Sequence, residues 1–251
     1  MGNDTTGRFA ILLFALASTF ILLPVAAQVD AFPETQRVVI SAILLAAVYA
    51  VFHSRRALVF TVAGGFAAIS LNWAAEISGA SALVAISQSF GAVFVLYIVA
   101  IIVRTINEQD SVHLGTVLGG ICVYLLLVVS FSQLHGLLNH LQAGAYLIDG
   151  SPLPRWTVDA TQNELLTTLL YYSLTTITTL GYGDIVPAVA SSRILAGVEA
   201  VIGQLYLAVF LGRLVGMYTA QSIIPRAAAA GVAAASIGTA ADAGQTGGHI
   251  S

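Results

Sequence analysis

The sequence contains no lysine, and only 8% of its 251 residues carry a charge. A soluble domain carries about 25% charged residues, so this chain has too few to cover the surface of a water-soluble globule. Hydrophobic residues make up 58% of the chain, and the mean hydropathy is +0.91. The formal net charge of −3 is too small to indicate a nucleic-acid partner. The composition excludes a soluble enzyme and a secreted scaffold, and predicts an integral membrane protein.

Cysteine is also nearly absent, because Cys122 is the only one and lies in an apolar run. One cysteine cannot form an intrachain disulfide or, within one chain, a cysteine-based metal site. The sequence also offers no nucleophile–base pair. We therefore expect neither an enzyme nor a resident cofactor.

The sequence contains several long runs without charged residues. A membrane-spanning helix needs roughly 20 apolar residues. Six runs approach this length, and the last of them contains one acid: Phe9–Val29, Val38–Phe52, Ala57–Ala75, Ala80–Val103, Leu114–Leu134 and Ile194–Leu211. They predict an all-α integral membrane protein with six transmembrane helices.

The arginines predict how these helices are oriented. If the N-terminus is cytoplasmic, the inside carries Arg8, Arg55, Arg56, Arg104, Arg213 and Arg226, and the outside carries Arg37, Arg155 and Arg193. This excess inside agrees with the positive-inside rule and makes both termini cytoplasmic. The first run allows two interpretations, a retained span or a cleaved signal peptide, because Val25–Gln28 has small residues suited to cleavage.

The pattern changes between the fifth and sixth runs. Thr161–Glu164 is a capping box that predicts the start of a short helix, about residues 162–177. This helix is too short to cross a membrane, and a Gly-rich segment follows it. Such backbone persists at membrane depth only where it is buried in protein or lines a water-filled path. Small residues dominate after Pro225, so we expect residues 222–251 to form a disordered cytoplasmic tail.

The Gly-rich segment reads Thr179-Leu-Gly-Tyr-Gly-Asp184. It resembles the selectivity filter of the prokaryotic potassium channel family that has six spans and one pore loop per chain. The usual form is Thr-Val-Gly-Tyr-Gly-Asp, and Leu180 here replaces the valine. The resemblance implies a re-entrant pore helix, a filter over residues 179–183 and a homotetramer, because a ring needs four filters. It also implies K⁺ as the permeant ion, with three identical subunits and the lipid bilayer as partners.

The residue types explain why this segment suits a cation. K⁺ sheds its water only where oxygen atoms replace it, and stacked rings of backbone carbonyls from several chains supply them. Glycine permits the backbone geometry that points every carbonyl at one axis. We expect Thr179 to add a hydroxyl at the inner end and Tyr182 to pack against the pore helix. The candidate K⁺ ligands are Thr179, Leu180, Gly181, Tyr182 and Gly183.

Further residues are candidates for supporting the filter. The resemblance implies that Tyr171 hydrogen-bonds Asp184 and holds the filter taut; the alternative is that Tyr171 belongs to an aromatic belt. Thr175 stands where some family members carry an acid, and Thr178 directly precedes the filter. Glu199 is an acid inside a span, which indicates either a buried hydrogen-bonding role behind the filter or attraction of cations.

Three other positions complete the candidates. Gly203 falls where many such channels have a hinge glycine, and three interpretations are open: a gate hinge, a small residue for close helix packing, or no special role. His135 and His140 are expected in the outer pore region, exposed to solvent. No side-chain cluster indicates a metal centre.

The fourth run, Ala80–Val103, contains no arginine, so it lacks the charges that the membrane field moves in a voltage sensor. We divide the chain into a four-span domain (1–103), a cytoplasmic linker (104–113), a two-span pore domain (114–221) and the tail (222–251). The short linker favours packing of the four-span domain on the pore helices of its own subunit.

The predicted function is passive, K⁺-selective conduction across the inner (plasma) membrane, without an arginine voltage sensor. One alternative is a less selective monovalent cation channel, because leucine is bulkier than the usual valine. The other is a non-conducting membrane subunit or sensor on a channel scaffold.

Overall fold

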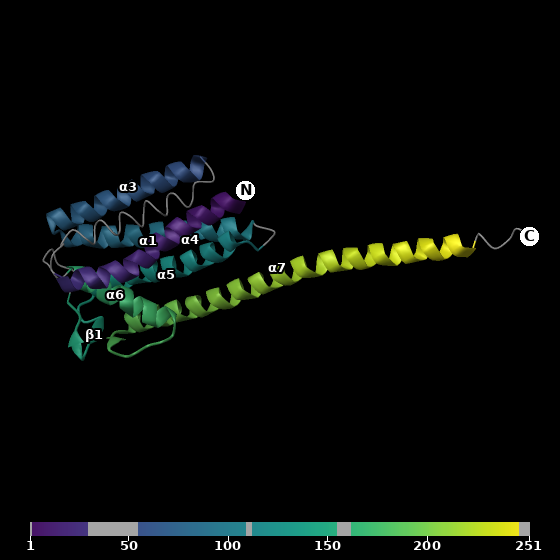
Figure 1. Cartoon of the computed structure of the whole chain (residues 1–251). Coiled ribbons are helices and arrows are strands. Elements are labelled where there is room, and N and C mark those ends of the chain that lie inside the picture. Colours follow the sequence, from purple (N-terminus) through teal and green to yellow (C-terminus); the bar gives the residue numbers. More distant parts are fainter. Residues whose placement is uncertain (1, 30–54, 109–111, 155–161, 246–251) are drawn as a thin grey trace, which may run out of the picture.

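The computed structural model describes residues 2–29, 55–108, 112–154 and 162–245 (Figure 1). Its elements, in chain order, are α1 (Gly2–Val29), α3 (Arg55–Ser78), α4 (Ser81–Asn107), α5 (Leu114–Leu141), β1 (Tyr146–Ile148), β2 (Ser151–Pro152), α6 (Gln162–Ile177), β3 (Ile185–Pro187) and α7 (Ala190–Gln245). The predicted helical runs that fall on described residues coincide with α1, α3, α4, α5 and α7, whereas Val38–Phe52 lies outside the described residues.

Three of the described helices are long and apolar enough to cross a membrane: Ser81–Asn107, Leu114–Leu141 and the Ala190–Ala220 part of α7. At 1.5 Å per residue, the 27 residues of α4 span about 40 Å, which exceeds the hydrocarbon core of about 30 Å. Shorter apolar helical segments cover Thr6–Leu22, Val59–Ala75 and Leu165–Ile177. The fold is that of a helical membrane protein.

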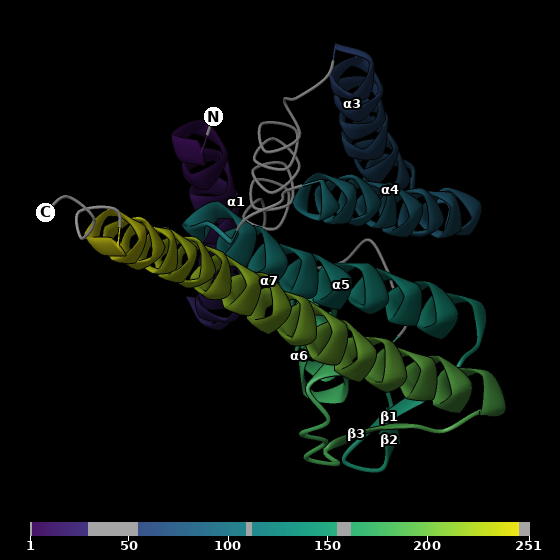
Figure 2. The ribbon, with the colours of Figure 1, turned by 90° about the vertical axis from the view of Figure 1, so that its right-hand side faces the viewer.

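Helix α5 lies at the centre of the fold and contacts α1, α4, α6 and α7 (Figure 2). One hydrophobic core joins Phe9, Leu12 and Leu16 of α1 to Val123 and Leu126 of α5, and all five side chains are almost completely buried. Helix α1 is therefore an integral part of the core around α5.

A glycine on α5 lets α7 approach closely. A Cβ atom at Gly120 would collide with the ring of Phe210 on α7. The Tyr206 hydroxyl, also on α7, donates to the Gly120 carbonyl at 2.7 Å. Small residues at such crossings allow the backbones of membrane helices to pack together.

Helix α4 packs against α5 of the same chain. The Ser130 hydroxyl of α5 donates to the Ala92 carbonyl of α4 at 3.3 Å. Helix α4 continues to Asn107 and α5 begins at Leu114, so the connection is shorter than the linker expected at 104–113. A short connection keeps neighbouring helices adjacent and antiparallel.

A small antiparallel sheet, which no pattern in the sequence predicted, follows α5. Its strand order is β2-β1-β3, and β1 pairs with β3 from Tyr146 opposite Pro187 to Ile148 opposite Ile185. Asp149 and Gly150 turn the chain between β1 and β2 with φ values of 49° and 80°. Asn-Gly and Asp-Gly pairs favour such hairpin turns because both residues tolerate positive φ.

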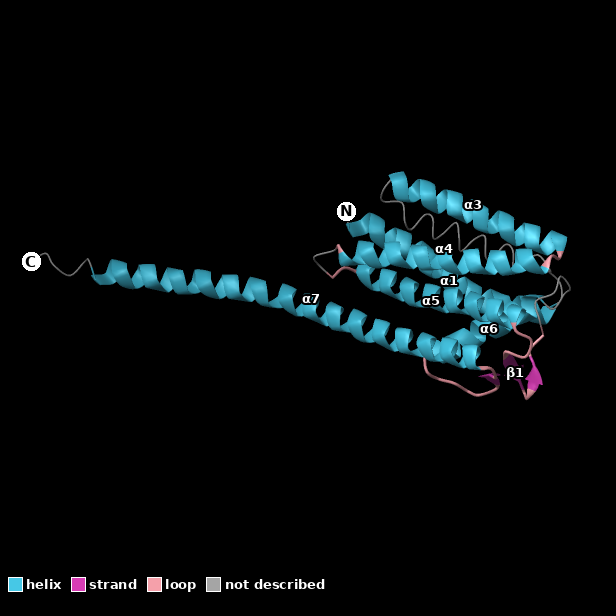
Figure 3. Ribbon diagram, turned by 180° about the vertical axis from the view of Figure 1, so that it is seen from behind, coloured by secondary structure: helices cyan, strands magenta, loops and turns pink. Residues whose placement is uncertain are grey.

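Helix α7 extends well beyond the helical bundle (Figures 1 and 3). We expected disorder from residue 222, but the helix continues to Gln245, with Pro225 inside it. Alanine is the best helix former, which favours a helix in this Ala-rich stretch. The N-terminal end of α1 and the projecting part of α7 lie at one end of the bundle, and the sheet lies at the other.

Candidate functional site

The short helix α6 leads directly into the Gly-rich segment. It ends at Ile177, and the chain then folds back on its last turn, where the Thr175 carbonyl accepts hydrogen bonds from the amides of Leu180 at 2.9 Å and Gly181 at 3.2 Å. The Thr179 amide donates to the Thr176 carbonyl at 2.9 Å. Since the last carbonyls of a helix have no partner within it, these bonds satisfy them and fix the start of the segment.

Left-handed backbone recurs at every second residue of this segment. The φ values are 59° at Thr179, 52° at Gly181 and 83° at Gly183. Glycine adopts this conformation without strain, as expected for Gly181 and Gly183, whereas a β-branched residue such as Thr179 does so only where its surroundings impose it. Sparsely populated conformations of this kind cluster at functional sites.

Aromatic and acidic side chains support the outer end of the segment. The rings of Tyr171 and Tyr182 stack with centroids 6.5 Å apart and an interplanar angle of 7°. The side chains of Tyr171 and Asp184 are close enough to interact electrostatically. The Asp184 carbonyl accepts a hydrogen bond from the Asp149 amide at 3.1 Å, which ties this end to the β1–β2 turn. Tyr182 thus lies against a ring of α6, and the hydrogen bond from Tyr171 to Asp184 stays a prediction.

Thr175 in α6 and Thr178 just after it both donate to carbonyls of α6. The Thr175 hydroxyl donates to the Tyr172 carbonyl at 3.0 Å, and the Thr178 hydroxyl donates to the Leu174 carbonyl at 2.7 Å. Thr175 is buried and Thr178 is exposed. Thr175 contributes to the site through its backbone carbonyl, described above.

A buried polar cluster lies behind α6. The Glu199 carboxylate of α7 receives a hydrogen bond from the Ser173 hydroxyl of α6 and contacts His135 Nε2 of α5 at 2.7 Å. His135 Nδ1 lies 2.5 Å from the Tyr146 hydroxyl of β1. All four side chains are 0% exposed.

The expectation that His135 is solvated is wrong. His135 is enclosed by the rings of Tyr146 and Tyr172, at centroid distances of 5.4 and 4.9 Å. The available signal was Glu199, because an acid inside a span requires a partner, and His135 is an ionisable residue in another apolar helix. His140 instead contacts the Ser81 hydroxyl through Nε2 at 2.9 Å.

Gly203 packs against the end of α6. A Cβ atom there would lie 2.6 Å from the Ile177 carbonyl oxygen and would also collide with the Ile177 side chain. The same carbonyl accepts a hydrogen bond from the Tyr124 hydroxyl of α5 at 3.3 Å. Close packing therefore gives Gly203 a defined role, and its role as a hinge stays a prediction.

The segment and the neighbouring face of α7 are exposed in the single chain. Leu180 is 56% exposed and Tyr182 is 69% exposed. Large apolar side chains of α7 are exposed too, namely Ile194, Val198, Val201, Leu205, Val209 and Val215. Among the residues that the structure describes, no three His, Cys, Asp or Glu side chains gather as a metal site would require.

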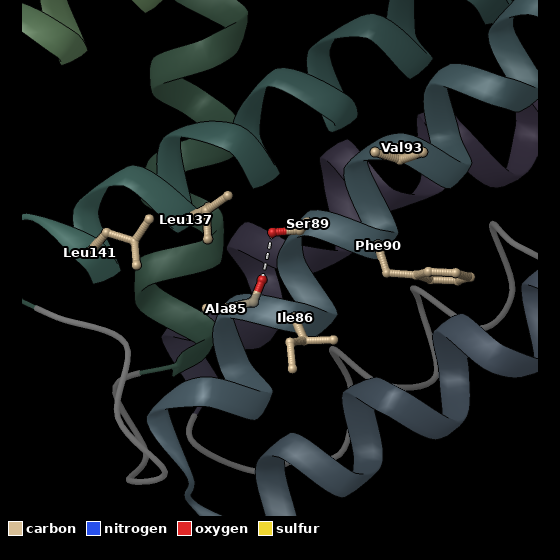
Figure 4. A pocket seen from close by; sticks show the side chains of 7 residues that line it. All are labelled: Ala85, Ile86, Ser89, Phe90, Val93, Leu137 and Leu141. Carbon is tan, nitrogen blue, oxygen red and sulfur yellow. Dashed lines mark hydrogen bonds between the residues drawn. The ribbon is translucent and has the colours of Figure 1, made fainter.

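A groove of about 500 Å³ between α4 and α5 lies apart from this segment (Figure 4). Its walls are apolar, and its one hydroxyl, on Ser89, donates to the Ala85 carbonyl at 2.7 Å. The groove offers no free polar group to a cation, so it is not a candidate cation site.

Residues 141–220 match a family of proteins described as ion channel. The matched segment runs from the end of α5 into α7 and includes α6, the Gly-rich segment and β3. No curated protein and no solved structure matches the chain. With the apolar helices, the match supports an ion channel function for a membrane protein.

Proposed function

We propose that the protein is a potassium channel that conducts K⁺ passively through a pore formed by four identical chains. The observation that carries the proposal is the backbone of residues 179–183, left-handed at every second residue and anchored to the last turn of α6. The match of residues 141–220 to ion channels gives this segment its context.

The backbone geometry suits a row of carbonyl ligands. In an extended strand, successive residues alternate between opposite sides. Left-handed residues at Thr179, Gly181 and Gly183 break that alternation and allow consecutive carbonyls to face one side. Four such rows around an axis replace the water shell of K⁺, and the Thr179 hydroxyls add a ring of oxygen atoms at the inner end.

Helix α6 favours a cation at the same place. Its C-terminal end carries a partial negative charge, equivalent to about half an elementary charge, and it lies directly before the segment that starts at Thr179. The stacking of Tyr171 on Tyr182 supports the outer end of the proposed filter. The partial charge of α6 would attract a cation, and the tyrosine stacking would keep the filter backbone rigid, which supports the proposed ion path.

A tetramer accounts for the exposed surfaces. One chain supplies one filter segment, so a closed ring requires three more copies, arranged with fourfold symmetry. Assembly would cover the exposed Leu180 and Tyr182 and the apolar residues of α7. The remaining apolar helices would face lipid, with both termini on the cytoplasmic side of the inner membrane.

The test is K⁺ flux into liposomes that contain the purified protein alone. We expect flux that follows the K⁺ gradient, and a bi-ionic reversal potential that favours K⁺ over Na⁺. A reversal potential near zero would instead indicate a less selective cation channel, in which Leu180 alters the filter. Absence of flux from a folded tetramer would indicate a non-conducting membrane subunit and overturn the proposal.

A further inference from the structure

The buried cluster of Tyr146, His135, Glu199 and Ser173 connects four different elements. Ionisable groups at zero exposure are costly unless every polar atom finds a partner. Here His135 uses both ring nitrogens and Glu199 uses both carboxylate oxygens. The cluster is thus a closed hydrogen-bonding unit rather than an isolated charge.

One end of this unit anchors the residues that precede the filter in the chain. Ser173 lies one turn before the end of α6, and its hydroxyl bonds to Glu199. The same oxygen lies 2.9 Å from the Val128 carbonyl of α5. Helix α6 is thereby fixed to both α5 and α7 just before residue 179, where the filter begins.

The other end anchors the residues that follow the filter in the chain. Tyr146 lies on β1, and β1 pairs with β3, which begins at Ile185 directly after the filter and Asp184. The Tyr146 hydroxyl lies 2.5 Å from His135 Nδ1, so β1 is hydrogen-bonded to this histidine. The other ring nitrogen, Nε2, lies 2.7 Å from the Glu199 carboxylate, so His135 links β1 to α7.

We propose that His135 and Glu199 are positioning residues that clamp the two ends of the filter segment together and thereby keep the filter selective. The clamp residues are Tyr146, His135, Glu199 and Ser173. The path from α6 through Glu199 and His135 to β1 and β3 bridges the ends of the filter outside the ion path. The inference rests on the proposed function, since selectivity is what the clamp protects.

The experiment removes one hydroxyl at each end of the clamp. Ser173→Ala removes the bond to Glu199 that anchors the residues before the filter. Tyr146→Phe removes the bond to His135 that anchors the residues after the filter, while its ring still packs on His135. Matched controls are Ser132→Ala, which removes a buried hydroxyl bonded within α5, and Tyr206→Phe, which removes the bond to Gly120. Each variant is purified as the full chain and reconstituted in liposomes.

We expect each clamp variant to lower the K⁺/Na⁺ permeability ratio at least about threefold, in keeping with the loss of one buried hydrogen bond. The double variant should lose less than the product of the single losses, because one broken end already opens the clamp. Glu199→Gln should retain most selectivity, since its amide can donate to Ser173 while Ser173 donates to Val128. Wild-type ratios in both single variants, or equal losses in the controls, would overturn the proposal.

A second measurement separates this inference from the proposed function. Hydrogen–deuterium exchange at the amides of Leu180 and Gly181 reports the order of the filter whether or not the protein conducts. We expect at least about tenfold faster exchange in Ser173→Ala and Tyr146→Phe, and no change in the controls. If the wild type conducts no K⁺ but the exchange result holds, the proposed function fails and the clamp stands. Unchanged exchange in both variants overturns the clamp.

Discussion

Arg213 on α7 donates a hydrogen bond from Nη2 to the carbonyl oxygen of Ile106, in the last turn of α4, at 2.8 Å. A second bond joins its Nη1 to the side-chain oxygen of Asn107, the last residue of α4. A cation at the C-terminal end of a helix satisfies free carbonyls and interacts favourably with the helix dipole. Arg213 therefore fixes α4 to α7 at the end of the bundle opposite the filter.

This relationship predicts unequal effects for two arginines. Arg213→Ala should lower the free energy of unfolding by about 1–2 kcal/mol, because it removes charge-assisted bonds at a helix end. Arg104→Ala should change it by less than about 0.5 kcal/mol, since its exposed ion pair with Glu108 is screened by water. Thermal unfolding followed by circular dichroism in detergent measures both. Equal effects of the two substitutions would contradict the role given to Arg213.

Substitution in the filter should abolish selectivity without preventing assembly. Gly181 has a φ of 52°, and the left-handed conformation costs a residue with a Cβ atom about 1–2 kcal/mol. We expect Gly181→Ala to lose K⁺/Na⁺ discrimination in bi-ionic reversal potentials while remaining tetrameric by native mass spectrometry. Gly216→Ala is the control, because a Cβ atom there meets no other atom within 4 Å. An unchanged reversal potential in Gly181→Ala would remove this residue from the filter.

Close packing at Gly203 predicts a loss of stability on enlargement. The Cβ atom of Gly203→Ala would press on the Ile177 carbonyl, and overpacking of this kind costs about 1–3 kcal/mol. Gly197→Ala and Gly212→Ala, where nothing lies within 4 Å, should be neutral or slightly stabilising because alanine favours a helix. Thermal unfolding of the three variants decides the matter. Wild-type stability with an altered open probability in Gly203→Ala would favour the hinge.

Gating should be insensitive to voltage, or nearly so. Helix α4 carries one arginine, Arg104, and that residue lies in the last turn, paired with Glu108. Each charge that crosses the membrane field contributes about 2.3 kcal/mol per 100 mV, and α4 has no charge in its apolar part to supply this. Open probability in a planar bilayer with symmetric K⁺ should vary little with voltage. A steep sigmoid would contradict this inventory of charges.

Packing of α4 on α5 within one subunit predicts the mass of a crosslinked product. The Ala92 carbonyl and the Ser130 hydroxyl are 3.3 Å apart, so cysteines at these positions should crosslink. With Cys122→Ser as background, Ala92→Cys combined with Ser130→Cys should give a band at monomer mass on a denaturing gel. The two single-cysteine proteins are controls. A ladder from dimer to tetramer would show that α4 packs on a neighbouring subunit.

Local patterns in the sequence predicted much of this structure. The apolar runs that fall on described residues became helices, and the capping box at Thr161–Glu164 indicated a short helix that the structure begins at Gln162. The glycine pattern predicted unusual backbone, which appears at Gly181 and Gly183. These features depend on neighbours in the chain, so a sequence reports them directly.

Features that depend on distant pairs were harder to predict. His135 and Glu199 are separated by 64 positions, and nothing local distinguishes a buried histidine near a helix end from a solvated one. The pairing of β1 with β3 joins strands of three residues each, which are too short to show a clear alternation. Left-handed backbone at Thr179 was also missed, because its cause is the hydrogen bonding of α6 to the residues after it.

The burial of α1 bears on how this protein can be divided. Phe9, Leu12 and Leu16 fill the same core as α5, and the Cys122 thiol contacts the Phe9 carbonyl at 3.5 Å. A fragment that began at α5 would expose to lipid a surface shaped to receive another helix, with small residues such as Gly119 no longer covered. Helix α1 therefore belongs to the same packing unit as α5, so the division of the chain at residue 103 separates segments of sequence that share one hydrophobic core.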